Sequence, residues 1–221
     1  MFLDKAIKDE INNVYIISVL HLPHEIILNT KDYFLLHLPD INHYYADCDP
    51  NSDKLSELCD KIKKINYKIL CTSNEQIAKN INSKKSTGYI QYVYNGEEIK
   101  ESESKLILLK DEDLNYVKET YHKGDYMDKL QKMKRILGYY QNGELIGYVM
   151  QHLNGSTGGL FIKPEYRNKG YGSMVLRGGY CKAGKWARFT QVAFDNKESI
   201  RVHEKLKCIK CECIIYYNSN D

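Results

Sequence analysis

The sequence of 221 residues lacks a long apolar run, an excess of one charge and a paired cysteine framework. Its most apolar stretch, residues 14–28, is interrupted by His21, Pro23 and Glu25, so we expect neither a signal peptide nor a membrane span. The formal net charge is only +3 and comes from interspersed charges, so we expect no nucleic-acid partner and no membrane partner. The seven cysteines are odd in number and scattered, which favours reduced thiols in a cytoplasm.

What is present is the composition of an ordinary globular protein, with 43% hydrophobic residues and enough length for one large domain or two small ones. Residues 97–104 are polar and acidic, and they are the best candidate for a linker. We therefore predict an N-terminal α/β half over residues 1–100 and a second domain over residues 104–221.

One stretch, residues 158–173, combines an apolar strand with a glycine-punctuated turn and the start of a helix. Residues 160–162 suit a buried strand, and Pro164 ends it because proline cannot donate to a sheet ladder. Gly170 and Gly172 permit backbone angles closed to other residues and let a ligand approach the main chain. A helix start leaves N–H groups without partners, at the positive end of the helix dipole. The predicted ligand is therefore anionic, as a diphosphate would be.

The segment Arg167-Asn168-Lys169-Gly170-Tyr171-Gly172, directly after Ile162-Lys163-Pro164-Glu165-Tyr166, resembles the acetyl-CoA signature of the GNAT superfamily of N-acetyltransferases. That signature is Arg/Gln-x-x-Gly-x-Gly/Ala after a Val-x-Pro-x-Tyr strand end. Asn196-x-x-Ser199 and Glu204-Lys205-Leu206 also fall where the family has Asn-x-x-Ser and Glu-Lys-Leu. The alternative is a glycine turn that only joins a strand to a helix.

The resemblance implies acetyl-CoA as co-substrate and no metal. In the family the pantetheine arm lies along the strand before the turn, which implies contacts with backbone groups of residues 160–162. Arg167 and Lys169 would supply charge to the diphosphate, although such cations often only solvate a turn. Asn196 matches the family asparagine that reaches the pantetheine, and it also fits a helix cap. The implied co-substrate-binding residues are Leu160, Phe161, Ile162, Arg167, Asn168, Lys169, Gly170, Tyr171, Gly172, Ser173, Asn196 and Ser199.

The sequence departs from the family pattern at the acid and at the base. Many members have a tyrosine seven residues after the asparagine, as the acid for the leaving thiolate, and here that position is His203. A histidine can donate a proton near neutral pH, so His203 is the candidate catalytic residue. The alternative is a polar residue on a half-exposed helix. Some members have a glutamate as base where this chain has Gln191, which leaves Glu119, Asp125, Glu144 or ordered water as alternatives.

Periodicity and turn signals predict the other elements. In the first half we expect one or two helices before Pro23 and a helix capped by Asn51 or Ser52. A further helix should start near residue 73. The strands predicted for this half are residues 33–36, 43–46, 67–71 and 88–94.

In the second half a hairpin is predicted around Asn142-Gly143. Helices are expected from residues 111–113 to 121, over 127–137, after 173 and over 197–206. The remaining strands are predicted at residues 106–109, 139–140, 145–150, 160–163, 189–194 and 209–217.

This order resembles a GNAT domain over residues 104–217, and it implies an α/β (α+β) fold with a mixed, mostly antiparallel sheet flanked by helices. The first half resembles the degenerate GNAT-like half of tandem members such as the glycine N-acyltransferase-like enzymes. The cysteines of Cys208-x-x-Cys211-x-Cys213 resemble half of a metal site, but no second ligand pair is spaced to complete it.

The leading hypothesis is a cytoplasmic, monomeric or homodimeric N-acetyltransferase. It would transfer acetyl from acetyl-CoA to a primary amine of a small molecule, amino acid or peptide by direct attack, and its first half would form one wall of the acceptor cleft. The alternative is a CoA-binding or interaction module without catalysis. The weaker option of a longer acyl donor also stays open.

Overall fold

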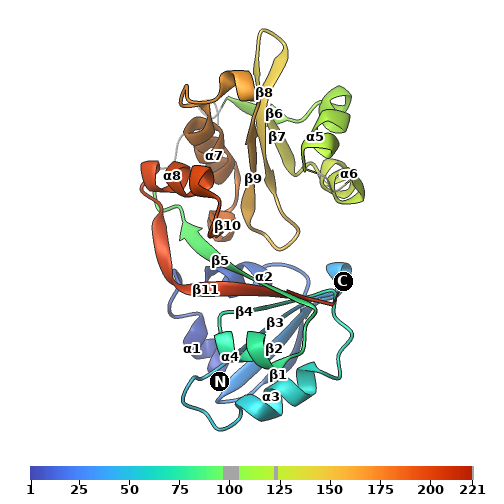
Figure 1. Cartoon of the computed structure of the whole chain (residues 1–221), viewed down its shortest axis with the longest axis vertical. Helices are drawn as coiled ribbons and strands as arrows, with labels where there is room; N and C mark the ends of the chain where they lie inside the picture. The colour runs from blue at the N-terminus through green and yellow to red at the C-terminus, as the bar shows by residue number, and fades with distance from the viewer. Residues whose placement is uncertain (97–104, 122–123, 221) are drawn as a thin grey trace. The chain divides into compact units, whose positions relative to one another are not determined.

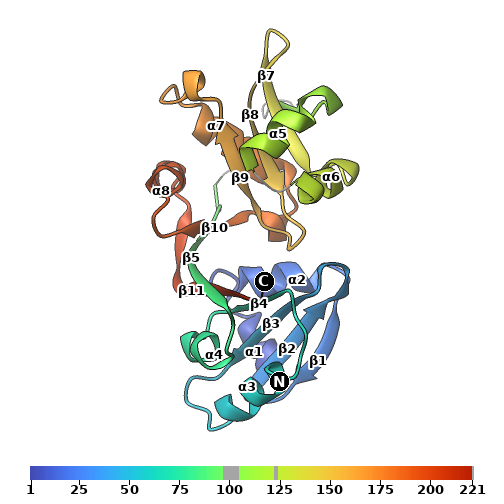
Figure 2. The same cartoon turned by 45° about the vertical axis from the view of Figure 1, so that its right-hand side comes forward.

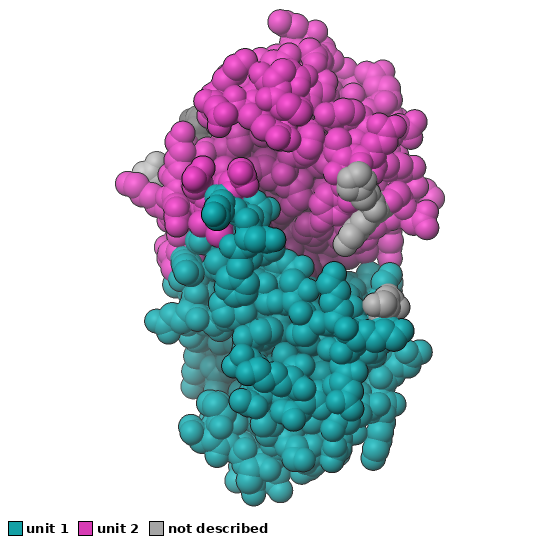
Figure 3. All heavy atoms as spheres, viewed as in Figure 1, with its two compact units in different colours: residues 1–93, 191–197, 210–221 teal, residues 94–190, 198–209 magenta. Residues whose placement is uncertain are grey.

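The structure is a computed structural model that describes residues 1–96, 105–121 and 124–220. It contains two compact units, coloured separately in Figure 3. Unit 1 comprises Met1–Val93, Gln191–Lys197 and Lys210–Asp221, and unit 2 comprises Tyr94–Thr190 and Glu198–Ile209. The expected linker, residues 97–104, lies outside the described residues. The compact units interleave along the chain, so the predicted domain limits of 1–100 and 104–221 stay a prediction.

Unit 1 is built on a seven-stranded sheet with the order β1-β2-β3-β4-β11-β5-β10 (Figure 1). The β3–β4 pair is parallel, whereas β1–β2, β2–β3 and β4–β11 are antiparallel. The strands are β1 Glu25–Asn29, β2 Tyr33–Leu38, β3 His43–Cys48, β4 Ile69–Thr72, β5 Lys85–Val93, β10 Phe189–Ala193 and β11 Ile209–Ser219. The helices are α1 Phe2–Ala6, α2 Val14–Leu20, α3 Leu55–Ile62 and α4 Glu75–Asn80.

The central strands of unit 1 are buried on both faces, as their continuous apolar runs require. In β2, Tyr33 and Leu35 join a core with residues of α3 and α4, while Phe34 points the other way and contacts Phe2 of α1. In β3 the buried carboxyl group of Asp47 points to the α2 face and accepts a hydrogen bond from Tyr15.

The sequence predictions for the first half hold for most elements but fail at two. The strand β1 was not anticipated, because its apolar residues continue the apolar run of the preceding helix. Neither Asn51 nor Ser52 caps α3: its N-cap position is Lys54, whose N–H donates to Ser52 Oγ. The helix expected near residue 73 is α4, where the Asn74 side chain accepts hydrogen bonds from two backbone N–H groups of the first turn.

Unit 2 contains a four-stranded antiparallel sheet with the order β6-β7-β8-β9. Helix α7 covers one face of this sheet, and α5 and α6 cover the other, as Figures 1 and 2 show. The strands are β6 Leu106–Leu108, β7 Ile136–Gln141, β8 Glu144–Gln151 and β9 Thr157–Ile162. The helices are α5 Leu114–Tyr121, α6 Gly124–Lys132, α7 Tyr171–Lys182 and α8 Lys197–Lys205.

The hairpin between β7 and β8 forms where it was predicted. Asn142 and Gly143 both have positive φ, of 50° and 84°, which is the backbone that a tight turn between right-twisted strands requires. The helix expected over residues 127–137 is too long, because α6 ends at Lys132. Lys134 then takes a left-handed conformation with φ of 56°, and Ile136 already begins β7.

The expected mixed and mostly antiparallel α/β architecture is confirmed, with parallel pairing in β3–β4 and antiparallel pairing in the other pairs given above. Among the residues that the structure describes, no helix has the length and apolar character needed to cross a membrane.

Candidate functional site

The start of α7 has several features that suit an anion. Gly170, the residue before the helix, has φ of 87°, and Asn168 also lies in the left-handed region with φ of 60°. Glycine adopts this conformation freely and asparagine tolerates it better than most residues. No side chain among the described residues caps the helix, and its first turn carries no acidic residue. The N–H groups of Tyr171, Gly172 and Ser173 therefore lie at the positive end of the helix dipole, an arrangement that suits an anion.

Two cations lie beside this helix start, and both are tied to nearby backbone. Arg167 donates from Nε to the carbonyl oxygen of Ile162 at 3.0 Å, and its guanidinium lies 5.6 Å from the ring centroid of Phe161. Lys169 donates from Nζ to the carbonyl oxygen of Glu165 at 3.0 Å. Both side chains are exposed, so their positive charge reaches the turn while these bonds fix their position.

Among the residues that the structure describes, β9 is the last strand of its sheet, so no further strand pairs with its outer edge, although Thr190 binds that edge at the carbonyl of Thr157. The N–H of Lys163 donates to Ile146 of β8, and backbone groups of alternate residues face opposite edges of a strand. Leu160 and Ile162 therefore present their backbone groups to the open edge, whereas those of Phe161 face β8. The Ile162 carbonyl that Arg167 contacts lies on this open edge.

A β-bulge interrupts β9 next to the open edge. The register passes from Phe161 opposite Tyr148 to Gly158 opposite Met150, so that two residues of β9 oppose one of β8. Gly159, inside the bulge, has φ of 60°. A bulge leaves backbone groups outside the ladder and re-aims them. It therefore supports the backbone N–H of Leu160 as a donor to a ligand lying along the strand.

A chain of buried hydroxyl groups pins the beginning of β9. Thr157 donates from Oγ1 to the carbonyl oxygen of Ala187 at 2.7 Å, and Thr190 donates from Oγ1 to the carbonyl oxygen of Thr157. The hydroxyl of Tyr180 lies 2.6 Å from Thr190 Oγ1, and His203 Nε2 lies 3.1 Å from the same tyrosine hydroxyl. This network of hydrogen bonds connects α8 and α7 with the first residues of β9 and β10, all within unit 2.

Residues 104–207 match the family model described as Acetyltransferase (GNAT) family. The chain carries an acetyltransferase domain of the GNAT family. No curated protein matches the sequence.

Solved structures support the same fold. A Drosophila protein is 13% identical, with a TM-score of 0.65 over 98% of this chain and 94% of its own. A GCN5-related N-acetyltransferase from Kribbella flavida is 9% identical, with a TM-score of 0.56 over 96% and 95%. A GNAT-family acetyltransferase from Colwellia psychrerythraea is 14% identical, with a TM-score of 0.50 over 91% and 87%. At such low identity these likenesses show the fold alone. The family match over residues 104–207 supports acetyl-CoA as co-substrate and an acetyltransferase of the N-acetyl type.

In the GNAT domain the candidate acid, His203, is 1% exposed. The helix that carries it is half-exposed, as expected, but this side chain faces the core. Its Nδ1 lies 2.7 Å from the carbonyl oxygen of Ser199, one turn earlier, and burial lowers the pKa of the imidazole. The histidine is therefore held in its neutral form, and its role as an acid stays a prediction.

The other candidate residues have defined surroundings. Asn196 directly precedes α8 and belongs to unit 1, so its reach to the pantetheine stays a prediction, as does that of Ser199. Gln191 donates to Gln91 Oε1 at 3.3 Å and accepts from the hydroxyl of Tyr217. Of the alternative bases, Glu144 accepts hydrogen bonds from Lys163 and Tyr166, and these bonds lower its pKa. That carboxylate is a weak base engaged elsewhere.

Of the C-terminal cysteines, Cys211 is buried and Cys213 is partly buried, and both thiols are hydrogen-bonded. The thiols of Cys211 and Cys213 donate to the carbonyl oxygens of Ile11 and Asn12. Burial raises the pKa of these thiols to about 11 and about 12, so both are protonated at neutral pH. A metal would need their thiolate forms.

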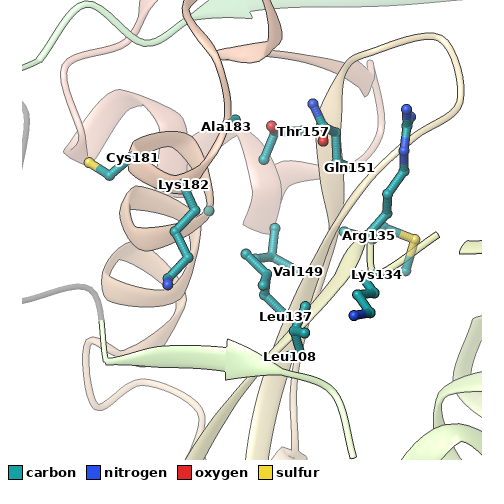
Figure 4. Close-up of a pocket in the computed structure, with 12 residues that line it drawn as sticks. Leu108, Lys134, Arg135, Leu137, Val149, Gln151, Thr157, Cys181, Lys182 and Ala183 are labelled. Carbon is teal, nitrogen blue, oxygen red and sulfur yellow. The ribbon is translucent and has the colours of Figure 1, made fainter. Parts of the chain in front are cut away.

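A cavity of about 400 Å³ lies in the GNAT domain near the C-terminal end of α7 (Figure 4). The turn at Asn168–Gly170 precedes the opposite end of this helix. Leu108, Leu137 and Val149 form its apolar part. The Lys182 side chain runs beside them, while the sulfur of Cys181 points away. The cavity is therefore separate from the turn that would hold the diphosphate.

A further histidine, His152, directly follows β8 and was not among the residues predicted from the sequence. Its Nδ1 lies 2.9 Å from the hydroxyl of Tyr126 in α6. A methyl group built on Gly158 in β9 would lie only 3.2 Å from His152 Nε2, so the ring lies against that strand. The only sequence signal was a histidine between a strand and the turn residues Asn154-Gly155.

Proposed function

We propose that the protein transfers an acetyl group from acetyl-CoA to a primary amine of a small molecule, amino acid or peptide. The observation that carries this proposal is the uncapped start of α7 placed at the end of the open strand β9, in a domain of the GNAT family. The uncapped start of α7 suits a diphosphate. The open edge of β9 suits an extended amide-bearing arm, such as pantetheine, that adds to a sheet edge.

The backbone N–H groups from Asn168 to Ser173 would bind the diphosphate, with Arg167 and Lys169 adding positive charge. Leu160 and Ile162 would bind the pantetheine through their outward backbone groups. The N–H of Leu160, next to the bulge, would polarise the thioester carbonyl, because a fixed donor stabilises the charge that develops on that oxygen. The amine would then attack the carbonyl carbon directly.

The binding part of the proposal can be tested at Gly172. A methyl there would meet side-chain carbons of Val202, Leu160 and Ile162 at 3.6–4.0 Å, so a small side chain is accommodated, whereas a larger one crowds the start of α7. We expect Gly172→Leu to weaken CoA binding, measured by calorimetry, by about tenfold or more, which corresponds to about 1.4 kcal/mol. The matched control is Gly184→Leu, because nothing lies within 4 Å of that exposed glycine. Equal CoA affinity in both variants and the wild type would refute the proposed diphosphate site.

Turnover separates the enzyme from a module that only binds CoA. Thiol release from acetyl-CoA should be measured with a panel of small amines, amino acids and peptides. We expect release above the hydrolysis background with at least one acceptor class. Tight CoA binding without release for the whole panel would favour the binding module. Repeating the assay with longer acyl-CoA donors tests the choice of donor.

A further inference from the structure

The turn between β8 and β9 holds His152 in a fixed position. The N–H of His152 donates to the carbonyl oxygen of Ser156 at 2.8 Å, and the carbonyl oxygen of His152 accepts from Gly155 N–H and from the Arg135 guanidinium at 2.9 Å. Asn154 closes the turn by accepting two hydrogen bonds from Ser156. The backbone that carries the imidazole is therefore bonded on both sides, which is the preorganisation a reacting group requires.

The ring of His152 is also oriented. Tyr126 places its hydroxyl 2.9 Å from Nδ1 and accepts a hydrogen bond from the N–H of Leu153 at 3.3 Å. The rings of Tyr126 and Tyr121 lie 6.0 and 6.3 Å from the imidazole, centroid to centroid. A tyrosine hydroxyl can accept as well as donate, so the pair admits the tautomer in which Nδ1–H donates to Tyr126 and Nε2 carries the lone pair. A hydroxyl acceptor at Nδ1 also suits the protonated ring, in which both nitrogens donate.

The Nε2 side of the ring lies against β9 close to the proposed reaction centre. It faces Gly158, two residues before Leu160, and strand residues are spaced by about 3.3 Å. Because of the bulge, the three steps from Gly158 to Phe161 oppose only two steps of β8, so the N–H proposed to polarise the thioester lies within about 7 Å along the strand from Gly158. An acceptor amine at that carbonyl would lie within reach of Nε2, either directly or through one water molecule. The histidine is half-buried, so an acceptor can approach it.

We propose that His152 is the general base of the acetyl transfer, positioned by Tyr126. This proposal rests on the proposed function and adds the group that the sequence analysis left unassigned. His152 Nε2 takes one proton from the acceptor ammonium. The neutral amine nitrogen then forms a bond to the carbonyl carbon, and the carbon–sulfur bond breaks with its electron pair on sulfur. A second proton leaves the nitrogen as the amide forms, the thiolate takes a proton from solvent, and His152 returns its proton to solvent.

The decisive variant is His152→Asn. The asparagine side chain can keep a hydrogen bond to Tyr126 in place of Nδ1 but has no counterpart of Nε2. With an acceptor that the wild type uses, we expect kcat to fall by about 100-fold or more, which is the usual contribution of a general base. The KM for acetyl-CoA should change little. The loss should be larger for an aliphatic amine of pKa about 10.4 than for an α-amino group of pKa about 8, since the latter loses its proton more readily without help.

A second variant guards against a structural explanation. His152→Ala leaves a space beside Gly158, and added imidazole should restore a substantial part of the lost turnover in a concentration-dependent way. His24→Ala is the matched control, because the imidazole of that histidine contacts the carbonyl oxygen of Leu22 on its own loop and has no part in the proposal, and it should show neither loss nor rescue. The emission of the single tryptophan, Trp186 of unit 2, reports whether each variant is folded.

The outcomes separate this proposal from the one it rests on. If the wild type turns over no acceptor, the proposed function fails before His152 is tested. If the wild type is active and His152→Asn keeps its kcat within about threefold, the histidine is not the base. An inactive His152→Ala variant that is folded and binds CoA, but is not rescued by imidazole, would also overturn the assignment. Tyr126→Phe should lower kcat less than His152→Asn and leave the KM for acetyl-CoA unchanged.

Discussion

Helix α7 contains two glycines at which the same substitution should have opposite effects. A methyl group on Gly179 would lie 2.8 Å from one methyl carbon of Val149 and 3.2 Å from the other, and 3.3 Å from a methyl of Thr157. Val149 is 1% exposed and β-branched, so its side chain has little freedom to move away. On Gly172 the same methyl would find ordinary contacts of 3.6–4.0 Å. Gly179→Ala is therefore expected to strain the contact between α7 and β8, and Gly172→Ala is not.

The size of the difference follows from two terms. Replacing a helical glycine by alanine stabilises by up to about 1 kcal/mol through backbone entropy, and this term is present in both variants. Overpacking a dense core costs about 1–3 kcal/mol, and this term belongs to Gly179→Ala alone. We therefore expect Gly179→Ala to be less stable than Gly172→Ala by about 1–3 kcal/mol. With a urea dependence of about 2 kcal/mol per molar, the midpoints should differ by about 0.5–1.5 M.

Urea unfolding followed by the emission of Trp186 measures this difference in the unit concerned. Adding Val149→Ala to Gly179→Ala should recover part of the loss, because the removed methyl carbons are those that the new methyl would strike. Equal midpoints for the two alanine variants would refute the close approach of α7 to β8. Additive effects of Val149→Ala and Gly179→Ala would refute the assigned contact.

Three further predictions concern buried polar groups. Thr190→Val removes the donor to Thr157 and the partner of the Tyr180 hydroxyl, so unit 2 should lose about 2–4 kcal/mol; an unchanged thermal midpoint in Trp186 emission would contradict this. Burial raises the pKa of Asp47 above its ordinary 3.8, so the folded state binds the proton more tightly than the unfolded state does. The wild type should therefore lose stability relative to Asp47→Asn as the pH rises from about 4 through the raised pKa, and parallel stability curves from circular dichroism would count against it. Burial lowers the pKa of His203 below 6.5, so the wild type should lose stability relative to His203→Gln as the pH falls from about 7 to about 5, which urea midpoints in this range will test.

The elements that sequence reasoning predicted correctly are those governed by local rules. Asn142-Gly143 forms its hairpin turn because two adjacent positive φ angles suit few other residue pairs. The strand before Pro164 and the helix after Gly170 form because the chain between them is punctuated by residues with narrow or unusual backbone preferences. The turn proposed to bind the diphosphate lies in this same segment, and its role stays a prediction.

The parts that were missed depend on contacts between elements, which the spacing of apolar residues within one element does not reveal. Strand β1 forms because Glu25–Asn29 pairs with β2, although Ile26 and Ile27 stay exposed and share the apolar run of a helix. The burial of His203 depends on the Tyr180 hydroxyl, 23 residues earlier, and no periodicity in α8 reveals it. His152 became a candidate only from its contacts in the fold. Its ring lies beside Tyr126 of the preceding helix α6 and Gly158 of the following strand β9.

The interleaving of the two units has a consequence for dissecting the protein. The chain passes from one unit to the other after residues 93, 190, 197 and 209, and β11 lies between β4 and β5 in the sheet. Deleting the first hundred residues would strip β11 of both neighbours and expose two rows of amide and carbonyl groups, a template for intermolecular strand pairing. The acetyltransferase segment would therefore aggregate when expressed alone. Loss of the first half in evolution would require changes in the last strand as well, because β11 would have no neighbours to pair with.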